Sequence, residues 1–254
     1  MGNNEAVIYD LEFTTWPEAY TRQWSKSNES REIIRIGAVN IDLDSLQEIG
    51  SLDVFVKPSV NPLLSDYCIK LTGITDEQIQ AEGIELHEAI HRFVDFVGDK
   101  RIYSYGADIV AILENLRINN ITYNAKTLKS NRTIVINEYH NYSYNQTDPY
   151  LQSNVVEVFL YGSGLFNTIG RISEGVRVEI NLNRNSVQLT AIDIKHWFFI
   201  NAPETQGKPS GKIAKALGIN ELKGNVHDPL FDARCVHMGL RELVLSRHIE
   251  NPLK

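Results

Sequence analysis

The chain has 254 residues, 43% of them hydrophobic, and a formal net charge of −7. This length can bury a full core as one large domain or two small ones. The charge argues against a broad electrostatic grip on nucleic acid, although an enzyme that binds one strand end is still compatible with it.

No apolar run approaches the roughly 18 residues that span a bilayer. The N-terminal "MGNNEAV" has no signal-peptide pattern, and Cys68 and Cys235 form no disulfide framework, so we predict a cytoplasmic soluble protein.

The first predicted strand, "VIYDLEFT" at 7–14, contains two acidic residues two positions apart. Side chains alternate along a strand, so Ile8, Asp10 and Glu12 share one face. Two like charges on one face of a core strand destabilise the fold unless something neutralises them. The pattern therefore favours a bound divalent cation, with further ligands from elsewhere in the chain.

The remaining chain predicts alternating strands and helices. Thr75 with Gln78 three residues later is typical of a helix capping box, and Gly98 marks a helix end. The predicted elements are an antiparallel strand pair at 32–42 and 48–58, helices within 68–80 and at 84–98, a strand at 101–108, a helix at 108–119, a short capped helix at 210–218 and a long amphipathic helix at 228–248.

Residues 120–190 differ in composition and predict a β-rich insertion of roughly 70 residues. This range is rich in asparagine, and alternating apolar residues run through 153–162. A hairpin is predicted at 176–191, with its turn at Asn183–Asn185. Without the insertion, roughly 180 residues of mixed strands and helices remain, which suits one α/β domain.

Three further candidate metal ligands lie far apart in the sequence. Asp108 follows a predicted strand, at the carboxyl end where open α/β sheets place their sites. His227 and Asp232 are five residues apart, and on one helix their side chains would diverge by about 140°. Asp228 is a good N-cap and Pro229 a good first helical residue, so His227 falls just outside the helix. Both side chains then point at one spot.

One motif pattern joins these candidates: Asp10-x-Glu12-x-Thr14, Asp108 and His227-x4-Asp232. It resembles the DEDDh family of 3′-to-5′ exonucleases, which have a ribonuclease-H-like fold. The chain is most similar to the branch of Eri-type and histone-mRNA 3′-end exonucleases and their bacterial relatives. Further similar stretches are "EIIRIGAV", "LTGIT", "SYGAD" and "IDIK". The resemblance implies an α/β exonuclease domain at 1–119 and 191–254, a mixed β-sheet flanked by helices, and leaves 120–190 outside it.

The resemblance also implies a two-metal site with a histidine base. Two ions about 3.5–4 Å apart need a cluster of carboxylates that positions them, and Mg²⁺ or Mn²⁺ suits an all-oxygen site. The implied ligands are Asp10, Glu12, Asp108 and Asp232, with Asp10 bridging both ions. His227 would be the general base that deprotonates the attacking water, for which its unperturbed pKa of ~6.5 is suitable.

The resemblance further implies substrate contacts near the start of the chain. Thr14 and nearby backbone would meet the 3′-terminal nucleotide, and Leu71, Thr72 and Gly73 would line the pocket for the terminal base or sugar. The expected substrate-binding set is Leu11, Phe13, Thr14, Leu71, Thr72, Gly73 and Tyr105. The implied function is two-metal 3′-to-5′ hydrolysis of single-stranded RNA or DNA with a free 3′ end, releasing nucleoside monophosphates.

The alternative function is a catalytically silent module that binds nucleic acid or protein on the same fold. The intact acidic cluster counts against it, because a binding module has no need to hold four mutually repelling acids. The insertion at 120–190 has nearly balanced charge, which favours protein contacts or self-association over a basic substrate groove. No membrane contact is expected.

Other motifs have competing interpretations. His87-Glu88-Ala89-Ile90-His91 matches the zinc-protease signature HExxH, but a third ligand is not apparent and an ordinary amphipathic helix is expected there. Asp193 is interpreted as structural. Two alternatives stay open for the aromatic residues Trp16, Tyr20 and Trp24, which could stack on bases or pack in the core. Two also stay open for Lys208, Lys212 and Lys215, which could contact substrate phosphates or form a solvated surface.

Overall fold

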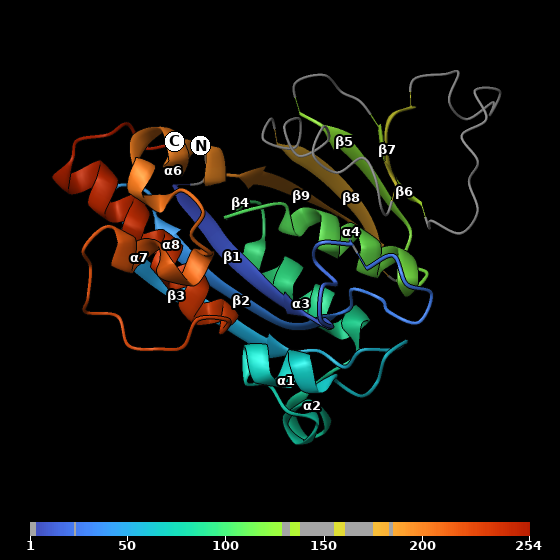
Figure 1. Cartoon of the computed structure of the whole chain (residues 1–254). Coiled ribbons are helices and arrows are strands. Elements are labelled where there is room, and N and C mark those ends of the chain that lie inside the picture. The colour runs from blue at the N-terminus through green and yellow to red at the C-terminus, as the bar shows by residue number, and fades with distance from the viewer. Residues whose placement is uncertain (1–3, 23, 129–132, 138–154, 161–174, 183–184) are drawn as a thin grey trace.

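A computed structural model of the chain describes residues 4–22, 24–128, 133–137, 155–160, 175–182 and 185–254. Over these residues nine strands form one sheet in the order β3-β2-β1-β4-β9-β8-β5-β6-β7 (Figure 1). The strands are β1 (Glu5–Phe13), β2 (Ile33–Asp42), β3 (Glu48–Phe55), β4 (Arg101–Ser104), β5 (Tyr123–Thr127), β6 (Thr133–Asn137), β7 (Val155–Leu160), β8 (Val176–Leu182) and β9 (Asn185–Asp193). β1 pairs antiparallel with β2 and parallel with β4, so the sheet is mixed.

Helices cover the sheet on both faces. They are α1 (Asp66–Thr72), α2 (Asp76–Glu82), α3 (Leu86–Val97), α4 (Asp108–Ile118), α6 (Lys195–Asn201), α7 (Ile213–Ala216) and α8 (Pro229–Arg241), with short turns η2 (Pro203–Thr205), η3 (Ser210–Lys212) and a π-helical η4 (Glu242–Ser246). Among these described helices, none is both long and apolar enough to cross a membrane. The predicted α/β, ribonuclease-H-like class, a mixed sheet flanked by helices, is confirmed.

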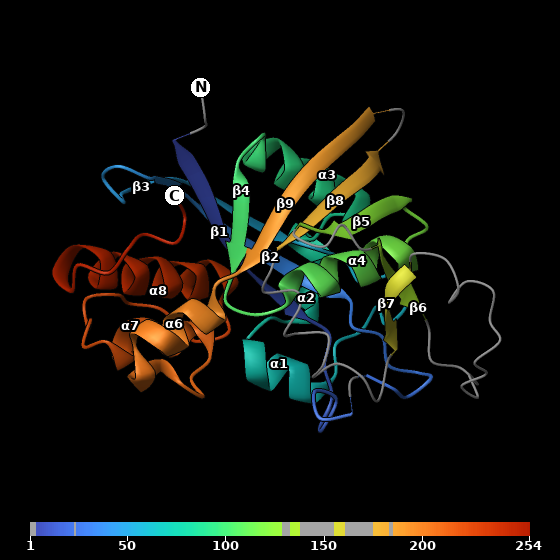
Figure 2. The same ribbon diagram turned by 90° about the horizontal axis from the view of Figure 1, so that it is seen from above.

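The predicted alternation along β1 divides the protein into two cores. Val7 and Tyr9 pack into the core with α3 and α4, and Ala6 and Ile8 pack into the core with α6, α7 and α8. Figure 2 shows α6, α7 and α8 on one side of the sheet and α3 and α4 on the other. Asp10 follows Ile8 on the face that α8 covers, so the acidic face of β1 is turned toward α8.

Most predicted elements before residue 119 are confirmed. β2 and β3 pair antiparallel, and Gly98 ends α3 with a positive φ of 59°. The Thr75 hydroxyl accepts from the Gln78 N–H while the Gln78 side chain accepts from the Thr75 N–H, which completes the predicted capping box at the start of α2.

Strands from the range 120–190 extend the central sheet. β8 pairs antiparallel with β9, with Leu182 opposite Asn185, so the predicted hairpin is present. Its turn at 183–184 lies outside the described residues, as does most of 129–174. β9 begins at Asn185, inside the expected insertion, and lies beside β4 in the sheet. The division of the chain into an exonuclease domain and an insertion stays a prediction.

Two predicted helices near the C-terminus differ from the structure. The segment 210–218 is not one capped helix but the turn η3 followed by α7, and the Ser210 hydroxyl does not cap either element. That hydroxyl donates to Asp232 instead. The segment 228–248 forms α8 only to Arg241 and then widens into the π-helical η4.

Candidate active site

Gly37 allows the start of α8 to lie directly on the sheet. Gly37 is on β2, opposite Asp10 of β1. A β-carbon at Gly37 would lie 2.1 Å from the Leu230 nitrogen and 2.2 Å from the Pro229 carbonyl carbon. Only glycine permits this approach of backbone to backbone. The approach brings the first turn of α8 over the acidic face of β1.

The local signals at the start of α8 direct His227 and Asp232 to one place. Asp228 is the N-cap and accepts from the Phe231 N–H at 3.0 Å, and Pro229 is the first helical residue. His227 precedes the cap with a φ of 71°, in the left-handed region. This predicted arrangement is present in the structure.

Candidate metal ligands from β1 and from the start of α8 meet at this place. One ring nitrogen of His227 and one carboxylate oxygen from each of Glu12 and Asp232 lie within 4.8 Å of one another. His227 Nδ1 is 3.6 Å from Glu12 Oε1. This contact with Glu12 raises the pKa of His227 above its usual value.

Asp10 and Asp108 lie close enough for their charges to act on one another, but they are not among the three residues whose ligand atoms meet within 4.8 Å. Burial raises the pKa of Asp10 well above its usual value, and the charges of Asp108, Asp232 and Glu12 add to the shift. Burial, with Asp193 nearby, raises the pKa of Asp108 to about 7. Burial, with Glu12 nearby, raises the pKa of Asp232 to about 7. Four acids that repel one another in a buried place have a high free energy unless a cation neutralises them.

The chemistry of these residues fits a divalent cation. Asp232 Oδ1 is buried and has no hydrogen-bond partner among the described residues. A buried carboxylate oxygen without a donor is costly, and coordination of a cation would satisfy it. Carboxylate oxygens are the ligands that Mg²⁺ and Mn²⁺ prefer.

Asp193 has the structural role that the sequence predicts. Its Oδ1 accepts from the Lys195 N–H at 2.8 Å and from the Gly106 N–H at 3.0 Å. These bonds hold the turn after β4 to the start of α6. The sequence did not indicate that Asp193 also lies close enough to raise the pKa of Asp108.

The structure places Leu11, Phe13 and Thr14, expected at the substrate, at the end of β1 and directly after it. Leu11 is buried in the core on the opposite face of β1 from Asp10, because side chains alternate along the strand. Phe13 packs edge-on against Trp24 with ring centres 5.4 Å apart. The buried Thr14 hydroxyl donates to the Ser30 carbonyl at 2.5 Å and accepts from the Glu32 N–H at 2.9 Å. The Leu11 and Thr14 side chains are buried and Phe13 is partly exposed, and the contact of this stretch with the 3′-terminal nucleotide stays a prediction.

The other expected substrate residues divide into internal and exposed groups. The buried Tyr105 donates to the Thr205 carbonyl at 3.3 Å, so its side chain is turned into the protein. The Thr72 hydroxyl donates to the Cys68 carbonyl at 2.9 Å, within the structure around α1. Leu71 and Gly73, at the end of α1, are exposed and available to a ligand.

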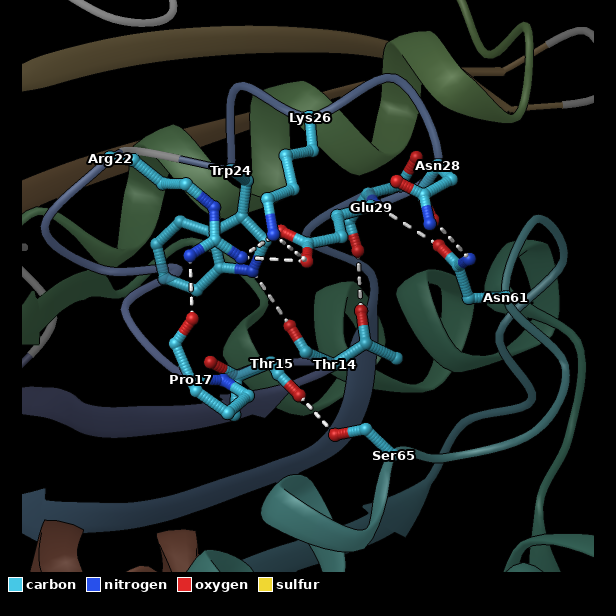
Figure 3. Close-up of polar contacts among 11 residues, drawn as sticks. Thr14, Thr15, Pro17, Arg22, Trp24, Lys26, Asn28, Glu29, Asn61 and Ser65 are labelled. Atoms are coloured by element: carbon cyan, nitrogen blue, oxygen red, sulfur yellow. Dashed lines mark hydrogen bonds and ion pairs between the residues drawn. The ribbon is translucent and has the colours of Figure 1, made fainter.

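Residues 14–22 and 24–32 lie beside the end of β1 (Figure 3). Trp24 is buried and its Nε1 donates to the Thr14 carbonyl at 2.9 Å, so this ring packs in the protein. Arg22 donates to the Pro17 carbonyl and to both oxygens of the buried Glu29. Tyr20 is 74% exposed, so stacking on a base stays open for this ring.

A polar contact that the sequence did not indicate joins this loop to α4. Arg31 Nε donates to the buried Glu114 at 2.7 Å, and the guanidinium lies over the rings of Phe13 and Trp24. Asn115, also buried, accepts from the Ile33 N–H at 2.9 Å. These contacts supply hydrogen-bond partners to two buried polar side chains of α4.

The alternative HExxH motif does not gain a third ligand. The rings of His87 and His91 are 4.8 Å apart on α3, and Glu88 pairs with Arg92 at 2.9 Å. In the part of the chain that the structure describes, the one cluster with metal-ligand geometry joins Glu12, His227 and Asp232. Lys208, Lys212 and Lys215 are exposed, which leaves their predicted contact with substrate open.

Solved nuclease structures share this fold over nearly the whole chain. One is described as "3'-end specific recognition of histone mRNA stem-loop by 3'-exonuclease" (15% identity, 96% of this chain, 82% of that chain, TM-score 0.58). A second is the nuclease domain of 3'hExo, a DEDDh family member bound to rAMP (15% identity, 96% and 94% coverage, TM-score 0.55). The chain therefore shares the overall fold of these structures.

The exonuclease family RNase_T matches residues 7–150, and the chain belongs to this family. Its curated relatives include human ERI1 exoribonuclease 2, 30% identical over 91 residues, and the zebrafish (Danio rerio) protein of that name, 34% identical over 87 residues. These matches cover 36% and 34% of this chain but only 12% and 14% of the relatives' own length. The resemblance to the Eri branch is thereby confirmed.

Proposed function

We propose that the chain is a metal-dependent 3′-to-5′ exonuclease that releases nucleoside monophosphates from single-stranded nucleic acid. The convergence of Glu12, His227 and Asp232 within 4.8 Å supports this function most directly. We further propose RNA as the preferred substrate, because the curated relatives are named exoribonucleases. The expected role of 120–190 in contacts with a partner or with a second copy stays a prediction.

Asp10, Glu12, Asp108 and Asp232 would hold two Mg²⁺ or Mn²⁺ ions. When bound, such ions stabilise the charge that develops on the phosphate during in-line displacement. The protein contributes the fixed positions of the acids. Asp10 and Glu12 are set by the pleat of β1, and Asp232 is set by the first turn of α8.

His227 would act as the general base. Its side chain is 35% exposed, so it lies at the edge of the buried acids where water can reach it. Glu12 Oε1 is 3.6 Å from Nδ1, within ion-pair distance of a protonated ring. A neutral ring takes the proton of the attacking water, and the nearby carboxylate stabilises the imidazolium that forms.

The test uses 5′-labelled single-stranded RNA and the matching DNA with Mg²⁺ or Mn²⁺. We expect a ladder that shortens from the 3′ end, faster on RNA and abolished by EDTA. Asp10→Asn and His227→Gln should lose cleavage. His91→Gln is the matched control: it removes a half-buried histidine of the HExxH motif on α3 and should cleave as the wild type does.

Two results would overturn the proposal. If the wild type cuts neither strand with either metal, the chain is better explained as a binding module on the exonuclease fold. If His91→Gln loses cleavage and His227→Gln retains it, the catalytic histidine has been assigned to the wrong element.

A further inference from the structure

The Ser210 side chain reaches the acidic cluster from a segment outside the exonuclease motif. Its Oγ donates to Asp232 Oδ2 at 3.1 Å, across 22 residues of sequence. Ser210 begins η3, and its hydroxyl makes no capping bond there or at the start of α7. The hydroxyl is therefore free of a helix-capping role and is directed at Asp232.

Ser210 supplies the shorter of two donors to one carboxylate oxygen. The other donor to Asp232 Oδ2 is the backbone N–H of His227, at 3.3 Å. The Ser210 hydroxyl has one proton to donate, and Asp232 Oδ2 accepts it. Without it, Oδ2 would keep only the longer bond.

The next residue closes the opposite side of the same carboxylate. A β-carbon at Gly211 would lie 2.1 Å from Asp232 Oδ1 and 2.7 Å from its Cγ, so the backbone of η3 is directly against the group. Asp232 is 2% exposed, and Oδ1 has no hydrogen-bond partner among the described residues. The carboxylate is thus held by a donor at one oxygen and by backbone contact at the other.

We propose that Ser210 is a positioning residue that fixes the Asp232 carboxylate for binding of a divalent cation. The inference rests on the proposed function, since it assumes that Asp232 is a metal ligand. Residues that orient metal ligands typically change metal affinity by about 10–100-fold when they are removed. Ser210 itself touches neither substrate nor metal in this role.

The test measures Mn²⁺ binding by calorimetry in the absence of nucleic acid. We expect Ser210→Ala to bind Mn²⁺ about 10–100-fold more weakly than the wild type. Ser210→Thr keeps the hydroxyl and should bind Mn²⁺ much as the wild type does. The matched control is Ser246→Ala, which removes the hydroxyl of an exposed serine that donates to Glu242 at 2.9 Å, and its affinity should not change. Raising Mn²⁺ should restore cleavage by Ser210→Ala.

The outcomes separate this inference from the proposed function. Wild-type Mn²⁺ affinity in a folded Ser210→Ala overturns the inference while the wild type still cleaves RNA. Loss of Mn²⁺ binding in a folded Ser210→Thr also overturns it, and this variant decides the matter if Ser210→Ala does not fold. If the wild type neither binds Mn²⁺ nor cleaves, the proposed function fails and the inference fails with it.

Discussion

Arg35 of β2 joins Asp228, the N-cap of α8, through a contact of 2.9 Å between Nη1 and Oδ2. The same guanidinium donates from Nε and Nη2 to both oxygens of Asp53, at 2.8 and 2.7 Å. Arg35 lies directly opposite Glu12 in the sheet. One side chain therefore ties the strand pair that carries Glu12 to the turn that carries His227.

Replacing Arg35 tests this connection. In Arg35→Met the methionine side chain can still cover the ring of Phe55, over which the guanidinium lies. Asp53 and Asp228 lose the hydrogen bonds that they accept from Arg35. We expect the free energy of unfolding to fall by about 2–3 kcal/mol, and cleavage to fall at least ~10-fold, because hydrogen bonds to charged groups are lost and the N-cap is freed. Urea unfolding and initial cleavage rates measure the two effects.

Arg92→Met is the matched control for Arg35→Met. Arg92 pairs with Glu88 one turn away on α3, where both side chains are about half exposed. Such a pair contributes less than ~0.5 kcal/mol, so stability and cleavage should hardly change. Full activity in Arg35→Met would show that the contact with Asp228 does not position His227.

Gly211→Ala should disrupt the site through a direct collision. The new methyl group would lie 2.1 Å from Asp232 Oδ1, and the buried carboxylate can move away only by breaking its bonds to Ser210 and His227. We expect at least a ~10-fold loss of cleavage. Gly50→Ala is the control, since its methyl group would meet only ordinary contacts at 3.8 and 3.9 Å. Equal activity in both variants would contradict the close approach of η3.

The stability of the metal-free protein should fall as the pH rises. Asp108 and Asp232 have pKa values of about 7 in the fold, against ~3.9 in the unfolded chain. Between these values the folded state binds more protons than the unfolded state, so the free energy of unfolding decreases with pH. Thermal unfolding in EDTA should show a Tm that declines from pH 5 to pH 8.

Asp232→Asn checks the cause of that decline. The amide cannot ionise, so the metal-free variant should have a higher Tm than the wild type at pH 8 and a flatter dependence on pH, although it should not cleave. Added Mn²⁺ should raise the Tm of the wild type more than that of the variant, because only the wild type retains the full set of ligands. A lower Tm for metal-free Asp232→Asn at pH 8 would contradict the assigned repulsion.

On the acidic side of the pH profile, the rise of kcat/KM with pH should reflect the loss of a proton from His227. Its pKa is raised by Glu12, and only the neutral ring can accept a proton, so kcat/KM should rise with pH through a value above ~6.5. His227→Gln should lose most activity and also this rise with pH. The measurement is kcat/KM against pH for the wild type and for His227→Gln, at saturating Mg²⁺. The same rise of kcat/KM with pH in both proteins would contradict the role of His227.

The two aromatic residues of the loop should respond differently to truncation. Trp24→Ala removes a buried ring and its bond to the Thr14 carbonyl, which should cost about 3–5 kcal/mol. Tyr20→Ala removes a side chain that is 74% exposed, and stability should change by less than ~0.5 kcal/mol. Urea unfolding gives both values, and a higher KM for RNA in Tyr20→Ala alone would assign base stacking to that ring.

Local signals in the sequence were sufficient to predict the strand that carries Asp10 and Glu12 and the helix cap that precedes Asp232. The alternation along β1 places Asp10 and Glu12 on one face, and the Asp228 cap with Pro229 places His227 beside Asp232. Each of these rests on residues within one turn or one strand, where dihedral preferences and pleat decide the outcome. No local sequence pattern predicts that the backbone of α8 lies directly against Gly37.

Contacts between distant segments could not be predicted in the same way. Ser210 to Asp232, Arg31 to Glu114 and Arg35 to Asp228 join residues 22, 83 and 193 positions apart. These partners are selected by how the helices pack on the sheet. For the same reason the sequence did not indicate that the Thr14 hydroxyl donates to the Ser30 carbonyl and accepts from the Glu32 N–H.

The most direct test of the central claim follows the 3′-terminal nucleotide itself. A single-stranded RNA labelled in its last phosphodiester is mixed with excess enzyme and Mg²⁺, and the labelled products of the first turnover are separated. The account predicts that the label appears first as a nucleoside monophosphate, while His227→Gln leaves it in the full-length strand. Label released first in oligonucleotides, or after the 5′ end has been shortened, would contradict a 3′-to-5′ exonuclease built on these residues.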